Sequence, residues 1–133
     1  TALLFIDLDN FKQVNDNYGH KAGDVLLIEI ARRLQQCLRP GDHLGRFGGD
    51  EFVMVFTGLK SSAISSITNK IKNVFSERVK TREYLLNVNA SIGVGVFDSN
   101  NLDLDMGINL VDKAMYQAKK INGTSIYYHL EEK

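Results

Sequence analysis

Two adjacent glycines, Gly48 and Gly49, separate two strand-like runs near the middle of the chain. A Gly-Gly pair in this setting predicts a hairpin turn, because both residues can take positive φ at little cost. Asp50 and Glu51 follow directly and should lie at the exposed end of the second strand. Two carboxylates beside a turn with almost no side chains predict a site where a polyanion approaches the backbone and a metal ion bridges the gap.

Hydrophobic periodicity divides the rest of the chain into strands and helices. Apolar residues alternate in the predicted strands and recur every three or four residues in the predicted helices. The predicted strands are 2–8, 43–47, 51–57, 87–97 and 125–128, and the predicted helices are 11–18, 22–38, 61–78 and 106–120.

This element order, β-α-α-β-β-α-β-α-β, predicts an α/β (α+β) fold with a mixed central sheet covered by helices. Inside it we expect a ferredoxin-like, palm-type βαββαβ core like that of nucleotidyl cyclases. In such a core the end of the first strand neighbours the hairpin, so Asp7 and Asp50 should converge and could hold Mg²⁺. Gly93 and Gly95 share one face of their strand and should allow a helix to approach closely.

Composition restricts the classes of function. The 133 residues suffice for a single domain, 1–133, with its own core. The 16 basic and 16 acidic residues balance, so bulk charge does not favour nucleic acid as a partner. The single cysteine, Cys37, is expected to be a buried thiol in a cytoplasmic protein or in the cytoplasmic part of a larger one. No apolar run is long enough to span a bilayer, and no signal peptide is evident.

Seven short motifs occur in a fixed order along nearly the whole chain. They are Phe5-Ile6-Asp7-Leu8-Asp9-Asn10-Phe11-Lys12, Asn15-Asp16, Gly19-His20, Gly23-Asp24, Arg46-Phe47-Gly48-Gly49-Asp50-Glu51-Phe52, Ser91-Ile92-Gly93-Val94, and Asp112 with Met115-Tyr116 and Ala118-Lys119. Together they resemble the GGDEF domain family of bacterial diguanylate cyclases. The resemblance implies an enzyme that condenses two GTP molecules into the second messenger cyclic di-GMP and releases pyrophosphate.

The resemblance implies roles for the carboxylates. Asp7, Asp50 and the carbonyl of Leu8 match the family's ligands for Mg²⁺ (or Mn²⁺). Glu51 matches the residue proposed to help deprotonate the attacking 3′-hydroxyl or to bind a second metal. Two structural alternatives remain at this stage: Asp7 could be a strand-end cap, and Asp9 could be a helix N-cap rather than a ligand.

The resemblance also implies the GTP contacts. Asn15 and Asp24 match the guanine-reading positions, and a carboxylate can accept hydrogen bonds from the two adjacent donors of guanine. The alternative for Asp24 is a cap of the helix predicted at 22–38. Lys12 and Lys119 match triphosphate-binding lysines, and the side chains absent from Gly48 and Gly49 let the backbone lie against the nucleotide.

Two further positions bear on affinity and regulation. Gly123 stands where the family usually has a basic residue, and neighbouring Lys120 could replace it. Arg39 and Asp42 match the family's inhibitory Arg-x-x-Asp site, which binds product, with Lys70 as a secondary contact. The alternative is a plain polar turn, because Pro-Gly-Asp is ordinary turn composition.

The family resemblance sets the expected partners. Each protomer would hold one GTP in a homodimer, so an upstream sensory domain could control activity, and a phosphodiesterase domain can follow Lys133. The family's helix ahead of the first strand is absent, so the chain looks trimmed. The main alternative is a catalytically weak or inactive module that binds GTP or cyclic di-GMP and regulates. Another palm-like nucleotidyl cyclase would share the metal carboxylates, but Asn15 and Asp24 speak against ATP.

Overall fold

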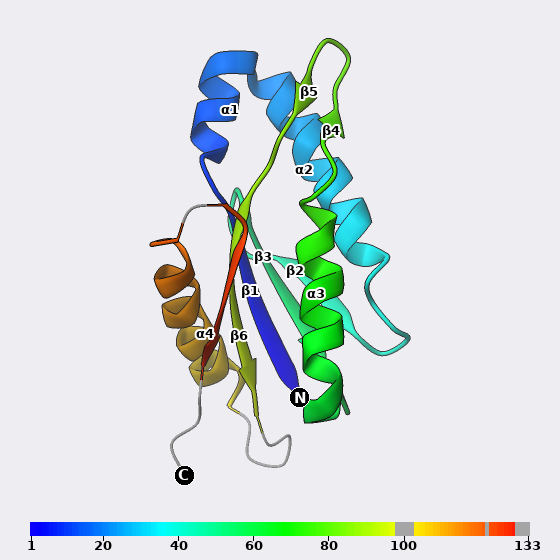
Figure 1. The fold of residues 1–133 in the computed structure, drawn as a ribbon, viewed down its shortest axis with the longest axis vertical. Coiled ribbons are helices and arrows are strands. Elements are labelled where there is room, and N and C mark those ends of the chain that lie inside the picture. Colours follow the sequence, from blue (N-terminus) through cyan, green and yellow to red (C-terminus); the bar gives the residue numbers. More distant parts are fainter. Residues whose placement is uncertain (98–102, 122, 130–133) are drawn as a thin grey trace.

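The fold is a five-stranded sheet between helices, seen in a computed structural model that describes residues 1–97, 103–121 and 123–129 (Figure 1). The strands are β1 (Ala2–Leu8), β2 (His43–Arg46), β3 (Glu51–Phe56), β4 (Val79–Lys80), β5 (Leu85–Leu86), β6 (Ala90–Val96) and β7 (Ser125–His129). The helices are α1 (Phe11–Tyr18), α2 (His20–Gln35), the 3₁₀ turn η1 (Ser61–Ala63), α3 (Ile64–Val74) and α4 (Leu104–Ala118).

The sheet order is β2-β3-β1-β6-β7, and only the β6–β7 pair is parallel. The first four of these strands have the order of a ferredoxin-like βαββαβ core, which confirms the predicted fold class. The centre belongs to β1, whose residues are all buried. Its nearly continuous apolar sequence suits a strand that is covered on both faces.

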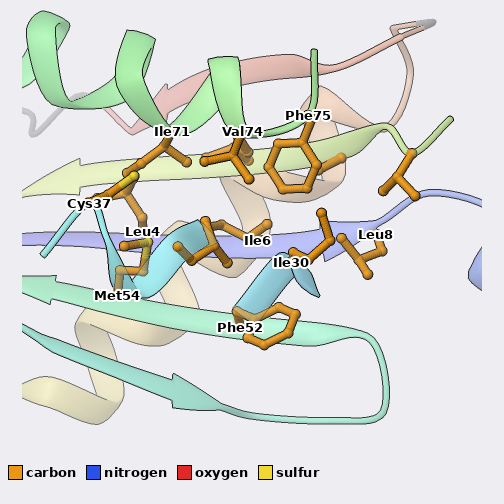
Figure 2. Close-up of a cluster of buried hydrophobic side chains, with 14 of the residues drawn as sticks. Leu4, Ile6, Leu8, Ile30, Cys37, Phe52, Met54, Ile71, Val74 and Phe75 are labelled. Atoms are coloured by element: carbon orange, nitrogen blue, oxygen red, sulfur yellow. The ribbon is translucent and has the colours of Figure 1, made fainter. Parts of the chain in front are cut away.

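Helices cover both faces of the sheet, α2 and α3 on one and α4 on the other (Figure 1). Side chains alternate along β1, so Leu4 and Ile6 join the larger core beneath α2 and α3, where Ile30 and Ile71 meet them (Figure 2). Leu3 and Phe5 point to the α4 face, where they meet Val111 and Met115. Asp7 continues this second row at the end of the strand.

Arg33 of α2 ties the larger core to the end of α3. Its guanidinium donates hydrogen bonds to the backbone carbonyls of Val74, Glu77 and Arg78 at 2.8–3.0 Å. These carbonyls lie where α3 ends, so the arginine supplies partners that the helix itself cannot provide.

The structure moves several predicted boundaries. The helix predicted at 22–38 begins at His20 and ends at Gln35. The helix predicted at 61–78 ends at Val74 and is followed by the unpredicted β4–β5 hairpin. The last predicted helix begins at Leu104, because the carboxylate of Asp103 caps it by accepting from two backbone N–H groups.

The glycines of β6 bring α4 against the sheet, as predicted. A Cβ on Gly93 would overlap the carbonyl oxygen of Val111 and lie 2.5 Å from the amide nitrogen of Met115. A Cβ on Gly95 would lie 2.8 Å from a methyl carbon of Val111. At Gly93 the obstacle is backbone, which cannot rotate away as a side chain can, so this contact fixes the position of α4.

We therefore expect Gly93→Ala to lower the free energy of unfolding by about 3 kcal/mol, as overpacking against fixed atoms does. Urea denaturation followed by circular dichroism measures the change. Gly45→Ala in β2 is the matched control, because a Cβ there meets no described atom within 4 Å. Equal midpoints for the wild-type chain and Gly93→Ala would contradict the close backbone contact.

Candidate functional site

Three segments meet at one end of the sheet: the end of β1, the turn between β2 and β3, and the last turn of α4 (Figure 1). In the strand register Asp7 lies beside Glu51 of β3 and Ser91 of β6. The backbone N–H of Leu8 donates to the carbonyl oxygen of Asp50 at 3.1 Å. The structure thus brings together the carboxylates that the sequence places far apart.

Asp7 is a buried carboxylate with one satisfied oxygen. Its residue is 8% exposed, and its Oδ2 lies 3.0 Å from Nζ of Lys119. Its other oxygen, Oδ1, is buried with no hydrogen-bond partner among the described residues. Burial raises the pKa of Asp7 to about 6, and the charges of Asp50 and Glu51 act in the same direction against the opposing contact with Lys119.

Lys119 is the cation of the site. It is the C-cap residue of α4, where the helix dipole favours a positive charge. Its Nζ also lies 3.8 Å from Oδ1 of Asp9. Burial opposes the charged ammonium, but the hydrogen bond to Asp7 and the charges of Asp7, Asp9 and Asp50 outweigh it and raise the pKa of Lys119.

The Gly48–Gly49 turn connects β2 and β3, as predicted. The backbone conformation expected for it was wrong, because neither Gly48 nor Gly49 has a positive φ. Arg46 holds the turn instead: Nε donates to the Gly48 carbonyl at 3.2 Å and Nη2 to the Gly49 carbonyl at 2.7 Å. A Cβ on Gly49 would meet no described atom within 4 Å, so the space above the turn is open. The prediction missed this role of Arg46, although its place two residues before the glycines is a usable signal.

Glu51 begins β3, and its side chain lies beside Gly48. A Cβ on Gly48 would come within 3.1 Å of Oε2 of Glu51, so the missing side chain makes room for this carboxylate. Burial raises the pKa of Glu51, with further contributions from the charges of Asp50 and Asp112. A carboxylate whose pKa is raised accepts a proton more readily near neutral pH.

The sequence left open whether Asp9 is the N-cap of α1, and the structure shows that it is not. The N-cap of α1 is Asn10, which has a left-handed backbone (φ 59°) and makes no capping side-chain hydrogen bond. The Oδ1 of Asp9 instead accepts a hydrogen bond from Oγ of Ser91 at 2.8 Å. The prediction assigned no role to Ser91, although the period of two in its strand puts it on the face of Gly93.

The oxygen atoms at this end of the sheet suit a hard divalent cation. The unpartnered buried Oδ1 of Asp7 is the strongest indication, because a buried carboxylate oxygen is costly to leave without a partner. Within residues 1–97, 103–121 and 123–129, no three His, Cys, Asp or Glu side chains form a complete metal cage. A site for Mg²⁺ needs only one or two carboxylates, because water and substrate phosphates complete its shell.

The predicted base-reading residues lie on the α1–α2 pair. Asp24 is in the second turn of α2, which begins at His20, so the alternative that it caps this helix is wrong. It lines a cavity of about 340 Å³ together with Arg46 and Phe52, between α2 and the β2–β3 hairpin. The Oδ1 of Asn15 occupies the space that a Cβ on Gly23 would need. Lys12 is exposed in the first turn of α1.

Arg39 and Asp42 form a closed turn beyond the opposite end of β3. The Arg39 guanidinium binds both oxygens of Asp42, at 2.9 and 3.0 Å, and the carbonyl oxygen of Thr57 at 2.8 Å. The side chain of Asp42 is 1% exposed, and its hydrogen bond with Arg39 lowers its pKa. The pair is therefore a preformed turn, held by contacts between its own residues and with Thr57.

The residues that follow α4 lack the basic side chain expected at position 123 for binding phosphate. Gly123 has a positive φ of 79°, and a Cβ there would meet no described atom within 4 Å. The Nζ of Lys120 donates to Oε1 of Gln117 at 3.1 Å, within its own helix end. Lys120 therefore does not point to the carboxylates as Lys119 does.

None of the described helices is both long and apolar enough to cross a membrane.

Comparison with known proteins identifies the family of this chain. The family described as diguanylate cyclase, GGDEF domain, matches residues 1–125. The chain is 37% identical over 123 residues to Diguanylate cyclase DgcP of Escherichia coli (strain K12), a match that covers 89% of this chain and 35% of that protein. The chain therefore spans about a third of the length of this relative.

Solved structures agree with the sequence matches. The GGDEF domain of PA1120 (TpbB or YfiN) from Pseudomonas aeruginosa superposes with a TM-score of 0.88 at 32% identity, covering 97% of this chain and 76% of that one. The GGDEF domain of DgcB from Caulobacter crescentus, solved in complex with c-di-GMP, gives 0.86 at 25% identity, covering 96% and 77%.

The raised pKa of Asp7 makes stability depend on pH. An aspartate ordinarily has a pKa of about 4, so the folded chain binds this proton more tightly than the unfolded chain. The stabilisation from the neutral carboxyl is complete below about pH 4 and is lost as pH rises through about 6. Without metal, Asp7→Asn should gain stability relative to the wild-type chain by on the order of 3 kcal/mol between these limits.

Urea midpoints in metal-free buffer at about pH 4 and about pH 7.5 measure this difference. Asp105→Asn, at an exposed position in the first turn of α4, controls for the loss of a surface carboxylate. A gap between Asp7→Asn and the wild-type chain that is the same at both pH values would show that Asp7 titrates normally.

Proposed function

The chain belongs to the diguanylate cyclase GGDEF domain family, and we propose that it condenses two GTP molecules into cyclic di-GMP and pyrophosphate. One observation carries the proposal: a buried carboxylate with an unpartnered oxygen, an ammonium and two further carboxylates lie at the end of the sheet that carries the Gly48–Gly49 turn. This combination suits a triphosphate and a divalent cation, because oxygen ligands and one lysine can share the phosphate charge.

In the proposed reaction the 3′-oxygen of one GTP attacks the α-phosphorus of the other. The bond between the α-phosphorus and the bridging oxygen breaks, and pyrophosphate leaves with its electron pair. Glu51, whose pKa is raised, would accept the proton of the 3′-hydroxyl. Asp7, Asp50 and the Leu8 carbonyl would hold Mg²⁺ (or Mn²⁺), which supplies charge neutralisation at the phosphates.

The remaining site residues would bind and orient GTP. Lys119 and Lys12 would contact the triphosphate, and Gly48 and Gly49 would let it approach the backbone. Asp24 borders a cavity next to the β2–β3 hairpin, so its carboxylate is available for the N1–H and N2–H donors of guanine. Asn15 lies on the adjoining helix and would read the same base.

One protomer with one GTP cannot close a ring that needs two attacks. We therefore propose that catalysis takes place in a homodimer, with each protomer supplying one GTP. A flanking sensory domain could then act by bringing two copies together, and a phosphodiesterase domain could consume the product. We also propose a cytoplasmic location, alone or as the cytoplasmic part of a larger protein, because the single thiol of Cys37 suits a reducing compartment.

Asp50→Ala tests the catalytic assignment. Losing this carboxylate should lower pyrophosphate release from GTP at least about a hundredfold while the fold is retained. A coupled phosphate assay on the full chain measures the rate, and circular dichroism checks the fold. The matched control is Asp105→Ala, because Asp105 is exposed at the opposite end of α4 from Lys119. Undiminished release from a folded Asp50→Ala chain would remove the metal assignment.

We further propose that Arg39 and Asp42 bind the product and inhibit the enzyme. Arg39 can contact a phosphate or the Hoogsteen edge of guanine through two donors. Asp42, whose side chain is 1% exposed, would accept from the base only after releasing its contacts with Arg39 or Thr57. The proposal is supported by the partial exposure of Arg39, whose guanidinium is held in place by Asp42. Lys70 of α3 would add a secondary contact.

Arg39→Ala should therefore raise the concentration of cyclic di-GMP that halves activity by at least about tenfold, because a bidentate contact to a charged group is lost. Initial rates over a series of added cyclic di-GMP concentrations measure the shift. Arg32→Ala removes an exposed arginine of similar ion pairing, here with Glu29, and should leave inhibition unchanged. Identical inhibition curves for the wild-type chain and Arg39→Ala would reduce the turn to a structural element.

A second function, a module that binds GTP or cyclic di-GMP without turnover, is favoured by one observation. Gly123 offers no cation, and Lys120 is engaged with Gln117, so the phosphate grip rests mainly on Lys119. Calorimetric binding of GTP with no pyrophosphate release from the full chain would select this alternative.

A further inference from the structure

We propose that Asp9, held in place by Ser91, positions Lys119. When the carboxylate of Asp7 binds a metal ion, the ammonium of Lys119 would pair with the carboxylate of Asp9 instead. This inference rests on the proposed function, because it assigns a role within the same site. It treats Asp9 as a partner of Lys119 rather than as a metal ligand.

The first observation is that a buried hydroxyl group on β6 holds the carboxylate of Asp9 in place. Ser91 is fully buried, and its Oγ donates to Oδ1 of Asp9 at 2.8 Å. The backbone N–H of Asp9 donates to the carbonyl of Asn89 at 2.9 Å. Because both contacts come from β6 and the residue that precedes it, the carboxylate of Asp9 is fixed relative to the sheet.

The second observation is that Lys119 lies between two carboxylates at unequal distances. Its Nζ is 3.0 Å from Asp7 and 3.8 Å from Asp9. The shorter contact makes Asp7 its main partner while no metal competes. The longer contact leaves Asp9 near enough to attract the ammonium but not to compete with Asp7.

A divalent cation on Asp7 would change this balance. Two cations that share one carboxylate repel each other strongly at such distances, so the ammonium would lose Asp7 as its partner. Asp9 is the other carboxylate in ion-pair contact with Lys119 among the described residues. Moving toward Asp9 keeps the ammonium beside the site, where it can still reach a phosphate.

A double-mutant cycle on nucleotide binding tests this role. The probe is guanosine 5′-(α,β-methylene)triphosphate, titrated into the full chain at saturating Mg²⁺ by calorimetry. Asp9→Asn and Lys119→Met should each weaken binding about tenfold, and the double variant should bind no more weakly than Lys119→Met. Independent effects that multiply would overturn the proposal. If a titration over a series of Mg²⁺ concentrations then shows a higher Mg²⁺ requirement for Asp9→Asn, Asp9 is a metal ligand instead.

Ser91 supplies the conservative control. Ser91→Ala should weaken binding in the same direction but less than Asp9→Asn, and Ser91→Thr should restore wild-type affinity because it keeps the hydroxyl. Equal losses in Ser91→Ala and Ser91→Thr would mean that packing, not the hydrogen bond, matters at this position, and would remove Ser91 from the proposal.

A second cycle separates this inference from the proposed function, because it uses neither nucleotide nor metal. Urea denaturation measures the coupling of Asp9 with Lys119 in the wild-type chain and in Asp7→Asn. The coupling should be larger in Asp7→Asn, where Lys119 has lost its main partner. No coupling in that background would overturn the proposal even if GTP is bound, whereas a wild-type chain that binds no nucleotide would instead remove the proposed function.

Discussion

The contact between the backbone of α4 and Gly93 of β6 is the constraint on which the candidate site depends. It places α4 closer to the sheet than any side chain would allow. Because Lys119 caps this helix one turn after Met115, the same contact sets the ammonium above the end of β1. The site is thus positioned by packing between regular elements rather than by a loop.

A cost of this arrangement is the burial of Asp7. Its carboxylate lies in the row of Leu3 and Phe5, at the end of a strand that is otherwise apolar. Burial disfavours the charged form, and one ammonium does not offset it fully, as the raised pKa shows. Such a residue is better explained by binding than by stability, because a neutral side chain would fit the site at lower cost.

The sequence predicted the parts of the fold that periodicity encodes. Long strands such as β1 and β6 and the glycines that face α4 were recognised because their patterns are local. The β4–β5 hairpin was missed, because strands of two residues, such as Val79–Lys80, show no alternation. The family was confirmed, whereas the roles of individual site residues stay proposals. The interaction of Ser91 with Asp9 joins residues 82 positions apart, which no local pattern reports.

The C-terminal end of α4, which carries Lys119, should tolerate less sequence change than its N-terminal end at Leu104. The backbone of Lys119 lies about 6 Å along the helix axis from that of Met115, whereas the backbone of Leu104 lies about 16 Å from it on the other side. Tilting of the helix about its contact with Gly93 therefore moves the first turn much more than the last. Insertions and deletions ahead of Asp103 should accordingly accumulate between homologues without disturbing the chemistry at the far end of the helix.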